Sequence, residues 1–234
     1  MIFDPLQLAI PGVRALQPYQ PGKPNDIIQR EFGDEPIVNL ASNENPRTPD
    51  SVVRDFLDGS NDPFSRYPDG SGHALKNALA QNLDVTPNQI TLGNGSNDVL
   101  ELLVKAFVSP GEGVVVSEHA FAVYSLAASA VGAELKTAPA VEWGHDLQAM
   151  RDLVDRKTKL VFIANPNNPT GTWISETEVC TFLDSLPGSV ITVIDEAYFE
   201  YVDNGNFESA IPYINEGCCY CNPDLLQSVW SGWG

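Results

Sequence analysis

The sequence predicts an α/β fold with a mostly parallel sheet and helices on both faces. Three features lead to this prediction. Short apolar runs without polar alternation recur after residue 112, amphipathic segments separate them, and loops rich in Gly, Asn and Pro follow several of them. Strands buried on both faces show such uninterrupted runs, and helices connect parallel strands. The chain has 234 residues, 43% of them apolar, which is sufficient for a substantial core.

The expected elements alternate between the two hydrophobic periodicities. Helices are expected over residues 52–57, 73–83, 96–107, 124–130, 147–156 and 175–186, and strands over 89–93, 113–117, 132–140, 159–164 and 189–201. Ser175 and Glu178 have the spacing of a capping box, which fixes the start of the last helix. Residues 1–35 are rich in Pro and Gly and are expected to form an N-terminal arm.

The charge of the chain argues against two classes of partner. It contains 31 acidic and 13 basic residues, a formal net charge of −18. Such a chain repels nucleic-acid phosphates and anionic lipids, so neither nucleic acid nor a membrane is expected as a partner. No apolar run reaches the roughly 20 residues of a membrane span. Asp4 and Pro5 stand where a signal peptide carries basic residues, which favours a cytoplasmic protein.

Metal binding is not expected either. Three of the four cysteines, Cys218, Cys219 and Cys221, lie close together near the end of the chain. A C-C-x-C sequence with no second Cys or His cluster does not provide the four ligands of a usual zinc site.

Two segments place polar residues where ligands bind in open α/β sheets, beyond the carboxyl ends of strands. Gly93–Asn97 (GNGSN) opens directly into a helix, and free N–H groups at such a position favour a phosphate, although an ordinary N-cap is an alternative. Asn165–Gly171 (NPNNPTG) has two prolines that fix the backbone and present amide side chains, although a tight turn would also explain them.

A third segment, Asp195–Tyr198 (DEAY), follows the last apolar run. An aspartate at the end of a buried strand is costly unless it meets a cation or a donor. A ring N–H that must stay protonated is one such partner, and a structural arginine is the alternative.

Together, the three segments resemble the pyridoxal-phosphate aminotransferases of fold type I. Four further stretches resemble the histidinol-phosphate aminotransferase group: LQPYQPGKP, LASNENP, RYPDGSGHALKNALA and GNGSNDVLELLVKAF. The likeness extends from about residue 4 to Glu216. It implies that residues 36–216 form the large domain, incomplete here and without a C-terminal small domain.

The resemblance assigns a role to individual residues. Gly95, Ser96 and Asn97 match the turn that cradles the phosphate of pyridoxal 5'-phosphate, and Phe121 matches the aromatic residue that stacks on its ring. Asn168 and Tyr198 match donors to the phenolic oxygen of the cofactor, and Asp195 matches the carboxylate that pairs with the pyridinium nitrogen.

Other positions match less specific features of the family. Tyr67 resembles a tyrosine that reaches the phosphate of the neighbouring subunit, which implies a homodimer. Tyr19 and Asn43 resemble residues near the substrate. Tyr124 fits either the site or ordinary core packing.

The lysine that forms a Schiff base with the cofactor has no counterpart. The family spacing places it within residues 222–230, which read NPDLLQSVW, and no Lys or Arg follows Lys159. No catalytic residue is therefore assigned. The composition of residues 217–234 leads to the hypothesis of an aberrant, frameshifted tail, with a genuinely divergent tail as the alternative.

The resemblance implies transfer of an amino group between glutamate and imidazole-acetol phosphate in histidine biosynthesis, with 2-oxoglutarate as co-product. Without the lysine, a catalytically silent fragment of the same fold is the alternative. Aromatic or aspartate aminotransferases and threonine-phosphate decarboxylase also remain open as related activities.

Overall fold

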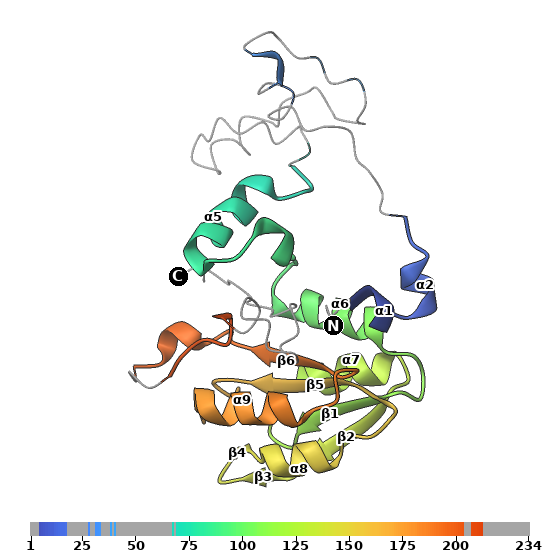
Figure 1. The fold of residues 1–234 in the computed structure, drawn as a ribbon, viewed down its shortest axis with the longest axis vertical. Coiled ribbons are helices and arrows are strands. Elements are labelled where there is room, and N and C mark those ends of the chain that lie inside the picture. The colour runs from blue at the N-terminus through green and yellow to red at the C-terminus, as the bar shows by residue number, and fades with distance from the viewer. Residues whose placement is uncertain are drawn as a thin grey trace, which may run out of the picture. The chain divides into compact units, whose positions relative to one another are not determined.

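The computed structural model describes residues 5–17, 28, 31–33, 38, 40, 67, 69–203 and 207–212. The chain divides into two compact units, one formed by residues 1–16 and 78–234 and the other by residues 17–77 (Figure 1). The helix expected over residues 52–57 lies outside the described residues.

The first unit is built on a four-stranded parallel sheet. Its strands are β1 (Gly113–Ser117), β2 (Glu134–Ala138), β5 (Thr158–Ala164) and β6 (Ile191–Asp195), in the order β2-β1-β5-β6. Every neighbouring pair is parallel. The carboxyl ends of all four strands therefore lie along one edge of the sheet, which confirms the predicted fold class.

Helices cover both faces of this sheet (Figure 1). They are α6 (Ser96–Phe107), α7 (Ala122–Ala130), α8 (Leu147–Asp152) and α9 (Glu176–Ser185). Shorter helices α1 (Pro5–Leu8) and α2 (Pro11–Arg14) precede them, and α5 (His73–Leu83) lies where the two units join in sequence.

Alternate residues of β1, β5 and β6 belong to opposite cores. One core contains Val114, Val116, Leu160, Phe162 and Val193 together with side chains of α6 and α7. The other contains Val115, Val161, Ile163 and Ile194 together with side chains of α8 and α9. Because successive side chains of a strand point to opposite faces, burial of both faces requires an uninterrupted apolar sequence.

The predicted start of α9 is confirmed. The Ser175 hydroxyl accepts a hydrogen bond from the Glu178 backbone N–H (3.4 Å), and the Glu178 carboxylate accepts one from the Ser175 N–H (3.0 Å). These bonds satisfy two of the donors that a helix leaves free at its N-terminus.

Three elements differ most from the predictions, whereas the other described boundaries agree to within two residues. Residues 90–93 form no strand, and a 3-10 helix, η1 (Pro87–Gln89), precedes them. The last strand ends at Asp195, after which η2 (Phe199–Tyr201) follows. The helix α8 ends at Asp152 rather than residue 156. Apolar content predicted the two strand segments, whereas a strand also requires a partner with which to exchange hydrogen bonds.

A β-hairpin was not predicted. Strands β3 (Ala140–Val141) and β4 (Gly144–His145) pair antiparallel, and Glu142 and Trp143 form the turn with φ of 50° and 66°. Two-residue hairpin turns usually carry Asn or Gly at positive φ. Because neither residue type occurs in this turn, no hairpin could be predicted from its residues.

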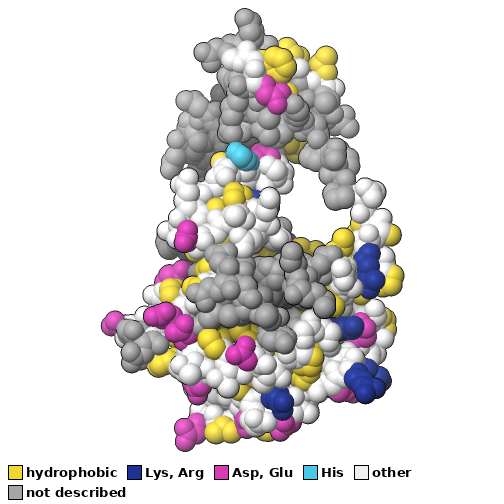
Figure 2. All heavy atoms as spheres, viewed as in Figure 1, with side chains coloured by type: hydrophobic (Ala, Val, Ile, Leu, Met, Phe, Trp, Pro, Cys, Tyr) yellow, Lys and Arg dark blue, Asp and Glu magenta, His cyan; other side chains and the backbone are white. Residues whose placement is uncertain are grey.

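Surface charge and hydropathy add two observations. Figure 2 shows acidic side chains at several separate places on the visible face of the described residues. Within the part of the chain that the structure describes, no helix is both long and apolar enough to cross a membrane.

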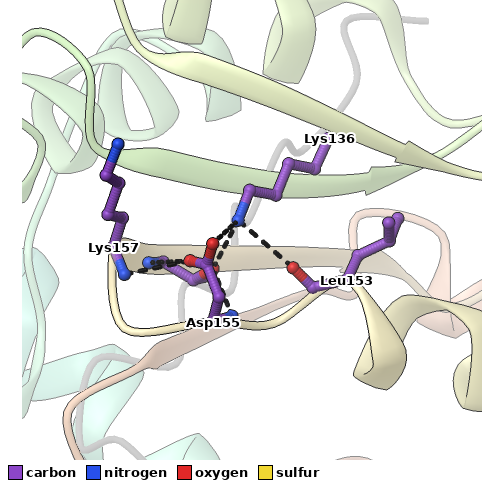
Figure 3. Close-up of polar contacts among 5 residues, drawn as sticks. Lys136, Leu153, Asp155 and Lys157 are labelled. Atoms are coloured by element: carbon purple, nitrogen blue, oxygen red, sulfur yellow. Dashed lines mark hydrogen bonds and ion pairs between the residues drawn. The ribbon is translucent and has the colours of Figure 1, made fainter.

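A half-buried lysine, Lys136, ties the start of β5 to β2 (Figure 3). The Lys136 ammonium lies 2.7 Å from the Asp155 carboxylate and also donates to the Leu153 carbonyl oxygen (3.3 Å). Asp155 additionally accepts hydrogen bonds from the backbone N–H groups of Lys157 and Thr158. The bonds from Lys136 and from the Lys157 N–H are the main reason why the pKa of Asp155 is lowered to about 2.

This cluster predicts a pH-dependent contribution to stability. A carboxylate with a lowered pKa stabilises the fold fully above its ordinary value of 3.8, and the contribution is lost as the pH falls through about 2. We expect the stability difference between wild type and Asp155→Asn, measured by urea unfolding, to be larger at pH 5 than near pH 2. Asp184→Asn, an exposed substitution on α9, serves as the control. A difference that stays constant over this range would contradict the assignment.

Candidate functional site

A pocket lies at the carboxyl edge of the parallel sheet. Its hollow of about 300 Å³, open solvent included, is lined by Ser96, Phe121, Ala164, Pro166, Asn168, Asp195, Ala197 and Tyr198. Five of the residues singled out from the sequence are among these, namely Ser96, Phe121, Asn168, Asp195 and Tyr198. The structure thus brings the three polar segments together around one pocket.

The topology of the sheet explains this convergence. Ala164 and Asp195 are register partners at the ends of the neighbouring strands β5 and β6. The loop after β1 carries Phe121 to the same edge, and α6 begins there with Ser96. Because all strands of the sheet are parallel, the loops that follow them gather at one edge.

The start of α6 depends on two glycines. Gly95 is the N-cap of α6 with φ of 82° and ψ of 173°, a conformation that side chains with a Cβ strongly disfavour. A Cβ on Gly93 would lie 2.6 Å from Cγ2 of Val99. Since Gly95 has no side chain to cap the helix, the first N–H groups of α6 receive no bond from the N-cap residue.

Two asparagines hold the loop after β5. The Asn165 side chain accepts a hydrogen bond from the Ile174 N–H (2.8 Å) and donates to the Ile174 carbonyl oxygen (3.0 Å). The Asn167 amide donates to the His119 carbonyl oxygen (3.1 Å) and to the Thr170 hydroxyl (2.7 Å). These bonds fix the loop on both sides of the pocket residue Asn168.

Asp195 is the buried charge of the pocket. Its side chain is only 8% exposed. One carboxylate oxygen accepts a hydrogen bond from the Tyr124 hydroxyl (2.7 Å), and the other accepts one from the Ala197 N–H (3.1 Å). A carboxylate has about four acceptor positions, so two donors leave capacity for a further donor from the pocket.

The neighbouring Glu196 is also buried, but its carboxylate binds residues of the chain and not the pocket. It is 1% exposed and accepts hydrogen bonds from the Ser209 hydroxyl (2.6 Å) and the Ala210 N–H (2.7 Å). Burial is the main cause that raises its pKa. Glu196 therefore binds residues 209–210 to the end of β6 and does not line the pocket.

The remaining sequence-predicted residues lie elsewhere or are not described. Gly95 directly precedes Ser96, whereas Asn97 is exposed and does not line the pocket. Tyr67 is 71% exposed and belongs to the unit formed by residues 17–77. Tyr19 and Asn43 lie outside the described residues. The proposed roles of these residues stay predictions.

Sequence reasoning left the place of Tyr124 open and missed its bond to Asp195. The side chain is fully buried in the core between the sheet and α6 and α7, so core packing is correct for its ring. Its hydroxyl nevertheless reaches the site. The sequence indicated this contact only by placing a tyrosine one helical turn after Phe121. Tyr124 and Asp195 lie 71 positions apart, so no local pattern could predict the hydrogen bond between them.

The conformation of Gly95 gives a direct prediction. Gly95→Ala is expected to destabilise the fold by about 1–3 kcal/mol, because φ of 82° with ψ of 173° is a backbone region that is essentially confined to glycine. Gly12→Ala is the control, since a Cβ at this position of α2 meets nothing within 4 Å. Urea unfolding of both variants measures the difference. Equal free energies of unfolding for the two variants would show that the start of α6 does not depend on Gly95.

Known proteins with similar sequences identify the family of this chain. The sequence profile of the aminotransferase class I and II family matches residues 35–220. Histidinol-phosphate aminotransferase 2 of Pseudomonas fluorescens is 50% identical over 225 residues, which cover 95% of this chain and 60% of that protein. Histidinol-phosphate aminotransferase 1 of Idiomarina loihiensis is 49% identical over 214 residues, covering 92% and 58%.

A solved structure agrees with these relatives. The crystal structure of histidinol-phosphate aminotransferase from Sinorhizobium meliloti in complex with pyridoxal-5'-phosphate has a TM-score of 0.61 and 28% identity, covering 84% of this chain and 53% of that one. This chain spans about 60% of the length of the curated relatives that it matches. The chain belongs to the aminotransferase class I and II family.

Proposed function

We propose that the pocket at the carboxyl edge of the sheet binds pyridoxal 5'-phosphate, and that the chain carries the cofactor-binding part of a histidinol-phosphate aminotransferase. The observation that carries this proposal is the shared pocket of Ser96 and Asp195. This cofactor needs hydrogen-bond donors for its phosphate and a carboxylate for its protonated ring nitrogen. Ser96 and Asp195 offer these groups in one pocket, although they lie about 100 residues apart in the sequence.

The residues present fit the chemistry of the cofactor. The N-terminus of α6 offers backbone N–H groups, the Ser96 hydroxyl and the positive end of the helix dipole to a phosphate. Phe121 provides an aromatic face for a planar ring. Asn168 and Tyr198 bring an amide and a phenol that can donate to an oxygen on the ring.

Asp195 has the central electrostatic role. Pyridoxal phosphate supplies a ring that accepts electrons from a breaking Cα–H bond when its nitrogen is protonated. A carboxylate beside that nitrogen favours the protonated form, because opposite charges at close range stabilise each other. Burial of Asp195 strengthens this effect, since solvent screens the pair less.

The names of the relatives support a proposal for the substrates, and the resemblance of Tyr67 supports one for the assembly. The identity of about 50% to histidinol-phosphate aminotransferases supports glutamate and imidazole-acetol phosphate as the substrates, with histidinol phosphate and 2-oxoglutarate as the products. We also propose that the full enzyme is a homodimer in which Tyr67 contributes to the cofactor site of the partner.

A second candidate function is cofactor binding without transamination. No lysine occurs in residues 222–230, and none is among the described residues that line the pocket. Lys136 cannot substitute, because it is paired with Asp155 near the start of β5, whereas the pocket lies beyond the end of that strand. We therefore propose that this chain binds the cofactor but does not catalyse transamination by itself.

The cofactor proposal predicts a specific loss of affinity. Pyridoxal phosphate is expected to bind the purified chain in equilibrium dialysis, and pyridoxal, which lacks the phosphate, to bind more weakly. Asp195→Ala should weaken binding by about ten- to a hundredfold, the value of a hydrogen bond to a charged group. Asp184→Ala on α9 is the matched control and should bind like wild type. Absence of binding by wild type, or equal binding by both variants, would refute the proposed site.

The proposal that this chain does not catalyse transamination has a separate test. The purified chain is incubated with glutamate, imidazole-acetol phosphate and cofactor, and 2-oxoglutarate is measured. No product above the protein-free rate is expected, and borohydride treatment should leave no cofactor-labelled lysine on mass spectrometry. Turnover with a labelled lysine would show that another lysine performs the reaction and would overturn the second candidate.

A further inference from the structure

Tyr124 touches two residues of the pocket without lining it. Its hydroxyl donates to Asp195 (2.7 Å), and its ring meets the ring of Phe121 edge to face with centroids 5.7 Å apart. Both Asp195 and Phe121 line the pocket. Tyr124 therefore lies directly behind the two groups that would contact the nitrogen and the face of the cofactor ring.

The position of Tyr124 is tightly determined. The side chain is 0% exposed, and its ring stacks on Phe162 of β5 with centroids 4.7 Å apart and an interplanar angle of 6°. A buried phenol needs a partner for its hydroxyl, and Asp195 is the partner here. Because the ring is held on both sides, the hydroxyl has little freedom to turn away from the carboxylate.

The Tyr124 hydroxyl also stays protonated and therefore remains a hydrogen-bond donor. Burial, followed by the charge of Asp195, raises the pKa of Tyr124 far above its ordinary value. The phenol thus keeps its proton over the working pH range, and the hydrogen bond always runs from tyrosine to carboxylate. A hydrogen bond to the charged form of an acid favours that form over the protonated one.

We propose that Tyr124 is a positioning residue for the cofactor site, whose hydroxyl orients the Asp195 carboxylate toward the ring nitrogen. This inference rests on the proposed function. It goes beyond the residues assigned by resemblance, because Tyr124 acts through Asp195 and not by contact with the cofactor. The Ala197 N–H holds the other carboxylate oxygen, so the two donors together define the plane of the carboxylate.

The main test is a double-mutant cycle on cofactor affinity. Equilibrium dialysis of pyridoxal phosphate is carried out with wild type, Tyr124→Phe, Asp195→Ala and the double variant. Tyr124→Phe is expected to weaken binding about tenfold or more, the effect of a lost bond to a charged group. In the Asp195→Ala background, the same substitution should change binding less than threefold, since its target is absent.

Two controls separate positioning from packing. Phe162→Leu removes the ring stacked on Tyr124 but keeps the hydroxyl and the carboxylate. Tyr201→Phe removes a hydroxyl from a residue that is 83% exposed. Both variants should bind within threefold of wild type. Equal losses in Tyr124→Phe and Phe162→Leu would overturn the inference in favour of a packing role.

The ring nitrogen of the bound cofactor gives a readout that packing would not move. Pyridoxal phosphate labelled with ¹⁵N in the ring is bound to wild type and to Tyr124→Phe, and the nitrogen chemical shifts are compared. A carboxylate that has lost the Tyr124 donor is less well oriented toward the nitrogen, so the shift in the variant should move toward that of the neutral free cofactor. Identical shifts in the two proteins would contradict the proposal.

Unfolding of the cofactor-free chain makes the result independent of the proposed function. If wild type binds no pyridoxal phosphate, the proposed function fails, and wild type and the same three variants are compared by urea unfolding. Tyr124→Phe should lower the folding equilibrium constant about tenfold in the wild-type background and clearly less beside Asp195→Ala. Equal reductions in both backgrounds would show that Tyr124 does not act on Asp195, whatever the cofactor does.

Discussion

The buried carboxylate of Asp195 is the constraint on which the arrangement of the site depends. Removing a charge from water costs several kcal/mol unless donors replace the lost solvent. The fold provides a phenol from α7 and a backbone N–H from the turn after β6. These donors leave further acceptor capacity directed toward the pocket, so a cationic ring nitrogen would complete the set. Under the proposed function, the charge would serve cofactor recognition and would not only be a cost to stability.

The parallel sheet is what brings this charge close to the N-terminus of α6, where we propose that a phosphate binds. Ser96 and Asp195 lie far apart in the sequence, yet α6 begins at the edge where β6 ends. The asparagines of the loop after β5 hold that loop through hydrogen bonds to Ile174 and His119. The site is thus assembled from loops whose positions are fixed by strand order, while the two cores on either side of the sheet supply rigidity.

Much of this arrangement could be predicted from the sequence, because the responsible signals are local. Uninterrupted apolar runs such as 159–164 predict strands buried on both faces, and the Ser175–Glu178 spacing predicts the start of α9. The turn of the hairpin at Glu142–Trp143 carries neither Asn nor Gly, so no local signal marked it. The non-strand conformation of residues 90–93 could not be predicted either, since a strand depends on pairing with distant residues. The bond between Tyr124 and Asp195 was missed for the same reason.

The most direct test of the account is the protonation state of the cofactor ring in the pocket. The chain is loaded with pyridoxal phosphate labelled with ¹⁵N in the ring, and the nitrogen chemical shift is compared with the shifts of the free cofactor in its protonated and neutral forms. The account predicts the shift of a protonated nitrogen at neutral pH. The shift of a neutral nitrogen for bound cofactor would show that Asp195 does not face the ring.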